Sequence, residues 1–138
     1  MSKVLQFFMP MKQPPTTTAQ QKQVTIINGK PIFYEPDSVK ETRALLSAHL
    51  SKHIPDKPFD GALGCTVKWC FPTDAKKYKD GDYRYTKPDT HNLNKLLFDV
   101  MTDLGFWVDD SRVAREVIEK FWVKESLPGI FIRIEVLK

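Results

Sequence analysis

The feature that most constrains the fold is a helix-periodic segment at residues 87–110, KPDTHNLNKLLFDVMTDLGFWVDD. Its apolar residues recur at intervals of three and four positions, which places them on one face of an α-helix. These residues are Leu93, Leu96, Leu97, Val100, Met101 and Leu104. Gly105 follows as a stop signal, because glycine readily adopts the left-handed conformation that ends many helices. The segment therefore predicts a helix that packs on a core and ends just before Gly105.

Length and composition indicate one domain in a reducing compartment. With 138 residues, of which 41% are hydrophobic, we expect a single domain over residues 1–138. The sequence contains no run of about 18 apolar residues, so we expect a cytoplasmic protein that makes no membrane contact. Cys65 and Cys70 fall on opposite faces of an apparent strand, which favours free thiols over a disulfide or a metal knuckle.

The rest of the chain alternates between strand and helix patterns in an α/β order. Strands are predicted at residues 4–10, 62–72, 111–125 and 129–137, and a hairpin at 24–36 turns at Asn28-Gly29. A second helix is predicted within residues 37–54, with Asp37 or Ser38 as its cap. The polar, proline-punctuated stretch around residues 11–23 is predicted to be a flexible loop, either an active-site flap or disordered.

A basic loop precedes the long helix. Between residues 76 and 88 it contains two aspartates, Asp80 and Asp82, and a larger number of cations. The cations are Lys76, Lys77, Lys79, Arg84 and Lys87. Three tyrosines are interleaved with them, and such a loop suits phosphate contacts and stacking on exposed bases. The overall charge of +4 is compatible with a nucleic-acid partner. An ordinary solvated hairpin tip explains the composition equally well, so composition alone leaves both interpretations open.

Carboxylates lie at both ends of the long helix. Asp89 stands where a negative charge caps a helix, and by itself that structural interpretation is the stronger one. Asp109 and Asp110 follow an apolar stretch, and two like charges held together are costly unless a cation joins them. The helix carries the chain about 24 Å between the two clusters. They can meet only if the chain folds back or if another subunit supplies one of them.

Two motifs in this segment resemble the RusA family of Holliday-junction resolvases. Members of that family carry a pattern close to D-x-D-N-L-x-K, a helix, and then G-x-x-x-D-D. The corresponding residues here are Asp89-Thr90-His91-Asn92-Leu93-Asn94-Lys95 and Gly105-Phe106-Trp107-Val108-Asp109-Asp110. The resemblance is specific over residues 87–115 and extends toward the C terminus. In the N-terminal part, Pro14-Pro15 is similar to the family's proline-rich loop.

The resemblance implies an α/β (α+β) fold with a small mixed sheet and two main helices, assembled as a homodimer. It further implies a structure-specific endodeoxyribonuclease that binds four-way junction DNA and makes paired nicks with Mg²⁺, or with Mn²⁺, and without an organic cofactor. Such enzymes act in DNA recombination and repair and are often encoded by prophages. Carried over, the metal ligands are Asp89, His91 and Asp110, and the catalytic set adds Lys95. The basic loop, on its own composition, is the candidate DNA-binding surface. The alternative for Lys95 is an ordinary surface pair with Asp99.

His91 departs from the family pattern, which has a second aspartate at this position. An imidazole can bind a divalent cation, but it suits Mn²⁺ better than Mg²⁺ and removes one negative charge. Three interpretations follow: a variant ligand, a weakened enzyme, or a junction-binding module that has lost cleavage. Binding of single-stranded RNA through the basic loop is a further alternative, and it ranks last because it leaves Asp109 and Asp110 unexplained.

Overall fold

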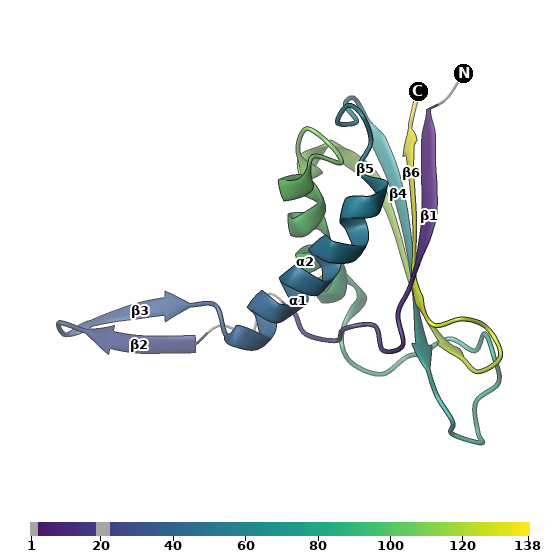
Figure 1. Cartoon of the computed structure of the whole chain (residues 1–138), viewed down its shortest axis with the longest axis horizontal. Coiled ribbons are helices and arrows are strands. Elements are labelled where there is room, and N and C mark those ends of the chain that lie inside the picture. The colour runs from purple at the N-terminus through teal and green to yellow at the C-terminus, as the bar shows by residue number, and fades with distance from the viewer. Residues whose placement is uncertain (1–2, 19–22) are drawn as a thin grey trace.

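The computed structural model describes residues 3–18 and 23–138, and its centre is a four-stranded mixed sheet in the order β1-β6-β4-β5 (Figure 1). Strand β1 (Val4–Pro10) pairs antiparallel with β6 (Gly129–Val136), and β6 pairs antiparallel with β4 (Leu63–Pro72). Strand β4 pairs parallel with β5 (Val113–Val123). The predicted α+β fold with a small mixed sheet is thus confirmed. The last two strands, β5 and β6, are not neighbours, because β4 lies between them.

The central strand β4 alternates as its sequence predicts. Leu63, Cys65, Val67 and Trp69 are buried on one face, whereas Thr66, Lys68 and Cys70 are only half-buried on the other. Both cysteines are free, as predicted, and burial raises the pKa of the Cys65 thiol to about 12.

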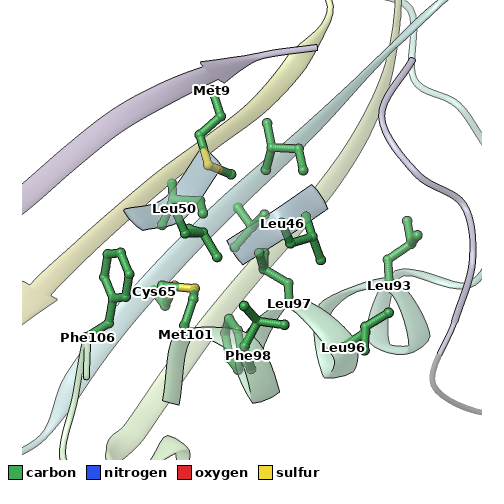
Figure 2. Packing of buried hydrophobic residues seen from close by; sticks show 14 of the residues in the cluster. Met9, Leu46, Leu50, Cys65, Leu93, Leu96, Leu97, Phe98, Met101 and Phe106 are labelled. Atoms are coloured by element: carbon green, nitrogen blue, oxygen red, sulfur yellow. The ribbon is translucent and has the colours of Figure 1, made fainter. Parts of the chain in front are cut away.

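Two helices cover one face of the sheet (Figure 1). Helix α1 (Asp37–Leu50) continues into a 3₁₀ turn (Ser51–His53), and α2 (Thr90–Leu104) packs beside α1. Figure 2 shows Leu46 and Leu50 of α1 and Leu97 and Met101 of α2 gathered near Cys65 in the core.

The apolar stripe predicted on α2 is confirmed. Five of its six members are buried and Leu104 is partly buried against the core. The helix ends at Leu104, and Gly105 adopts a φ of 87°, in the left-handed region that favours glycine.

The cap predicted for α1 is wrong. Neither Asp37 nor Ser38 caps the helix, because Pro36 occupies that position in an extended conformation and no side chain caps the helix there. The backbone N–H groups of Val39 and Lys40 donate to the Pro36 carbonyl. Asp37 is instead the first helical residue, where its charge still favours the positive end of the helix dipole.

Strands β2 (Gln23–Ile27) and β3 (Lys30–Tyr34) form a separate hairpin. Asn28 and Gly29 have φ values of 52° and 76°, and two positive values are what the predicted two-residue turn requires. Figure 1 shows the hairpin extending away from the sheet, beyond the N-terminal end of α1. Its apolar side chains are therefore exposed to solvent, with Ile26 at 74% and Phe33 at 72%.

The described part of the N-terminal loop packs on the body of the domain. Met11 and Pro14 are buried, and the Met11 N–H donates to the Pro128 carbonyl at 3.0 Å. Residues 19–22 of the loop predicted as flexible lie outside the described residues. Among the helices of the described chain, none is long and apolar enough to cross a membrane.

Candidate functional site

Asp89 occupies the N-cap position of α2, but its carboxylate does not cap the helix. The residue is extended, with φ −66° and ψ 145°, and no side-chain capping hydrogen bond is formed. Burial and the nearby Arg84 guanidinium lower the pKa of the Lys120 ammonium, and the Asp89 carboxylate opposes that shift. The Asp89 carboxylate therefore does not form the hydrogen bond that the capping interpretation requires. It lies within electrostatic reach of Lys120 on β5.

The chain folds back after α2 because two aromatic side chains enter the core. Phe106 and Trp107 are buried, and the segment is held by backbone hydrogen bonds to Phe59, from Phe59 N–H to Phe106 O at 2.9 Å and from Val108 N–H to Phe59 O at 3.0 Å. The Trp107 indole N–H donates to Thr102 Oγ1 at 2.8 Å. These contacts return the chain along α2 rather than away from it.

The two adjacent aspartates have different surroundings. Asp109 accepts a hydrogen bond from the Ser111 backbone N–H at 3.1 Å and caps a short 3₁₀ turn (Asp110–Arg112), and hydrogen bonding to Ser111 lowers its pKa. Asp110 lines a surface hollow of about 310 Å³ that it shares with His91 and Lys95. The Asp109 carboxylate thus forms a hydrogen bond within the turn, whereas Asp110 lines the hollow beside α2.

The same hollow contains residues that the sequence did not single out. Glu116 of β5 lines it and accepts a hydrogen bond from Asn94 Nδ2 at 3.2 Å. Asn94 is buried, and its Oδ1 accepts from the Trp69 indole N–H at 2.9 Å. A chain of hydrogen bonds therefore runs from the sheet to the hollow. The only indication of this network in the sequence is a polar residue, Asn94, directly next to Leu93 of the apolar stripe.

A second, wider hollow of about 650 Å³ adjoins Asp110 and carries a surplus of carboxylates. It is lined by Glu35, Asp99, Asp103, Asp109 and Asp110 together with Thr102 and one cation, Arg43. Arg43 pairs with Glu35 at 2.9 Å and with Asp99 at 3.8 Å. Burial raises the pKa of Asp99, and Asp110 adds to that rise while Arg43 opposes it. The negative charge around Asp110 therefore exceeds what Arg43 can neutralise.

The predicted site residues are only partly brought together. His91, Lys95 and Asp110 share one hollow, whereas Asp89 is not among the residues that line it. Within residues 3–18 and 23–138, no three His, Cys, Asp or Glu side chains are close enough to form a metal site by themselves. His91 and Lys95 are both exposed on the first turns of α2, on its solvent side.

The basic loop is bound to the sheet rather than projecting as a free hairpin tip. Gly81 N–H donates to Trp122 O and Trp122 N–H donates to Asp82 O, both at 2.8 Å. The Asp80 carboxylate accepts from the backbone N–H groups of Lys124 and Ser126 and from the Ser126 hydroxyl, and these bonds lower its pKa.

The five predicted DNA-binding cations fall into two groups. Lys76, Lys77, Lys79 and Lys87 are exposed. Arg84 is half-buried, and its guanidinium lies over the Phe71 ring at 4.3 Å and over the Trp122 ring at 4.5 Å. Four of the predicted cations are thus accessible to a ligand, whereas Arg84 packs on the domain.

Comparison with known proteins decides the family. The family described as "Endodeoxyribonuclease RusA" matches residues 12–135. This chain belongs to the RusA family. One relative, "Crossover junction endodeoxyribonuclease rusA" of Lactococcus phage r1t, is 32% identical over 100 residues, which cover 71% of this chain and 74% of the relative. The residues that the family matches span both motifs of the RusA resemblance, from Asp89 to Asp110.

Proposed function

We propose that this RusA-family protein is a metal-dependent endodeoxyribonuclease that resolves four-way DNA junctions by paired nicking. The observation that carries the proposal is the return of Asp110 along α2 into the hollow lined by His91 and Lys95. Mg²⁺ is commonly held by one or two carboxylates together with substrate phosphates and water. The free protein therefore does not need a complete ligand cage before DNA binds.

We assign Asp89, His91 and Asp110 as metal ligands and Lys95 as the cation that orients the scissile phosphate. Hard carboxylate oxygens and an imidazole are a donor set that suits Mg²⁺ or Mn²⁺. When bound, such an ion would lower the pKa of an attacking water and neutralise charge that develops on the phosphate. Lys95, with its exposed ammonium in the same hollow, supplies positive charge on the protein side.

A synthetic four-way junction tests the proposal. The purified protein is incubated with the junction in the absence of metal and with Mg²⁺ or Mn²⁺. We expect paired nicks at symmetry-related strands only when the metal is present. A metal-independent gel shift without nicks would instead select the alternative function, a junction-binding module that has lost cleavage because His91 replaces the second aspartate of the motif.

His91 should determine which metal supports cleavage. Because imidazole suits Mn²⁺ better than Mg²⁺, we expect wild-type nicking to be faster in Mn²⁺. His91→Asp should restore a hard ligand and a negative charge, and raise the rate in Mg²⁺ by about tenfold, the effect of about 1.4 kcal/mol. The measurement is nicking rate against metal identity for wild type, His91→Asp and His91→Ala. Three indistinguishable profiles would show that His91 does not bind the metal.

The exposed lysines of the basic loop should carry much of the salt-dependent affinity for DNA. Replacing Lys76, Lys77 and Lys79 by glutamine should reduce the slope of log K against log salt by about 2 to 3, if each lysine meets one phosphate. A matched control removes the same charge elsewhere, from the exposed Lys40, Lys52 and Lys57. Equal slopes for the two triple variants would mean that the loop makes no special contact with DNA.

We also propose that the active protein is a homodimer, because a junction offers two equivalent strands related by a two-fold axis. The surface of the β2–β3 hairpin suits contact with a second protein chain better than contact with DNA. Its only charged side chain between residues 23 and 34 is Lys30. One face of the hairpin presents Val24, Ile26, Pro31 and Phe33, which pair across the strands and are all exposed. An isolated two-stranded hairpin is marginally stable in water, so a docked partner would stabilise it.

A further inference from the structure

The segment that leads into Asp89 is held by two cationic side chains. The carbonyl oxygens of Thr86 and Pro88 both accept from Lys120 Nζ, at 2.5 and 2.7 Å. The carbonyl oxygen of Lys87, between them, accepts from Arg84 Nη2 at 2.7 Å. Three consecutive carbonyls before Asp89 are thus bound by cations. Hydrogen bonds with one charged partner are about twice as strong as neutral ones, so this segment has little freedom.

The two cations are themselves fixed on the sheet. Lys120 belongs to β5, and only 9% of its surface is exposed. Its backbone carbonyl accepts from the Arg84 N–H at 2.9 Å, which ties the loop to the same strand. The Arg84 guanidinium lies over the rings of Phe71 and Trp122, and its Nε donates to Thr86 Oγ1 at 3.1 Å. A continuous set of contacts therefore runs from strands β4 and β5 to the residue before Asp89.

The Lys120 ammonium group is already engaged by the protein, which does not fit a phosphate contact. Exposed lysines reach phosphates as mobile point charges, whereas two of the three Lys120 donors are directed at the backbone carbonyls of Thr86 and Pro88. Burying a lysine is costly unless its charge and its donors are satisfied. Both of these hydrogen bonds fall on the segment that leads into Asp89, so the charge of Lys120 acts on that segment.

We propose that Lys120 is a positioning residue for the reaction: its ammonium group clamps the Thr86 and Pro88 carbonyls and so fixes the direction of the Asp89 carboxylate at the start of α2. The inference rests on the proposed function, in which Asp89 binds the metal ion. Arg84 assists by holding the Lys87 carbonyl between the two clamped positions. Lys120 touches neither the metal nor the DNA, and it acts only through Asp89.

The test compares Lys120→Met, Lys120→Arg and Lys124→Met. Methionine keeps the length and apolar stem but removes the donors, arginine restores two donors and the charge, and the exposed Lys124 is the matched control near the end of the same strand. We expect Lys120→Met to raise the Mn²⁺ concentration for half-maximal junction nicking by about tenfold or more, equivalent to about 1.4 kcal/mol. Lys120→Arg should bring this Mn²⁺ concentration most of the way back to the wild-type value, and Lys124→Met should not change it.

Two further readouts separate positioning from DNA contact and from loss of fold. The salt slope of junction binding should be unchanged in Lys120→Met, and a slope smaller by about 1 would make Lys120 a phosphate contact and overturn the proposal. An unchanged Mn²⁺ midpoint would overturn it as well. If circular dichroism shows that Lys120→Met does not fold, Arg84→Met replaces it. That variant frees one carbonyl and should raise the Mn²⁺ midpoint, and no rise would count against the clamp.

Asp89→Asn, assayed in parallel, separates this inference from the proposed function. If Asp89→Asn nicks junctions with the wild-type dependence on Mn²⁺, the assignment of Asp89 as a ligand fails, whatever Lys120 does. If Asp89→Asn is inactive while Lys120→Met keeps the wild-type Mn²⁺ midpoint, only the positioning role of Lys120 fails.

Discussion

Replacing Asp110 or Asp89 by asparagine should lower the rate of junction nicking by at least about hundredfold, because each change removes a charged oxygen ligand from the metal. Junction binding should be retained or become tighter, since a negative charge near the phosphates is lost. Nicking is measured in Mg²⁺ and Mn²⁺, and binding by gel shift without metal. Asp110 is exposed and Asp89 makes no capping hydrogen bond, so we expect both variants to fold.

Asp109→Asn is the matched control for Asp110. It changes the neighbouring carboxylate to the same amide, and an amide oxygen can still accept the hydrogen bond from the Ser111 N–H. We expect Asp109→Asn to keep most of the nicking activity. Equal losses for the two variants would mean that the aspartates act through their summed charge. An Asp110→Asn variant that nicks at the wild-type rate would remove Asp110 from the ligand set.

The elements that were predicted correctly are those whose side-chain period is read directly from neighbouring residues. The stripe on α2 repeats every three to four positions, and β4 alternates every two, so burial on one face follows from local geometry. The turn at Asn28 and Gly29 was predictable for a similar reason, since few residue pairs tolerate two positive φ values. The cap of α1 was missed because Pro36 sets an extended conformation one residue earlier than the polar candidates.

The arrangement of the site depended on contacts between distant parts of the chain. The spacing of Asp89 and Asp110 left a fold-back and a second subunit as equal alternatives. The fold-back depends on Phe59, which lies far away in the sequence and hydrogen-bonds to Phe106 and Val108. No local sequence pattern predicts these hydrogen bonds between distant segments. The family motif indicated the residues of the site, but the grouping of His91, Lys95 and Asp110 around one hollow, without Asp89, required the tertiary structure.

In the basic loop, residues that look alike in the sequence have different roles in the structure. Five cations in one short segment looked equivalent in the sequence, yet Arg84 lies over Trp122 and holds the Lys87 carbonyl while the four lysines remain exposed. Phe71 of β4 and Trp122 of β5 provide the surface on which Arg84 packs. Lys120 was not singled out in the sequence because nothing there distinguishes it from a solvated lysine on a strand. Its burial follows only from the path of the basic loop across β5.

Ile26→Glu should convert the proposed dimer into monomers. In a hairpin, residues directly opposite one another share a face, so Ile26 and Pro31 lie on the same face as Val24 and Phe33. If two copies dock through this face, a carboxylate at its centre would be buried without a partner. Loss of a central interface residue typically costs 2 kcal/mol or more, which weakens dimerisation by at least about thirtyfold. Sedimentation at micromolar concentration measures the change.

Thr25→Glu is the control that isolates the face from the hairpin. Thr25 is the next residue along the same strand, is exposed, and points to the opposite face with Ile32 as its cross-strand partner. Both variants add one carboxylate to β2, so any general loss of hairpin stability should affect them alike. We expect Thr25→Glu to remain dimeric and to nick both strands of a junction. A dimeric Ile26→Glu variant would place the interface elsewhere, whereas a monomeric wild type with intact paired nicking would contradict the dimer itself, because one copy would then suffice to cut two strands.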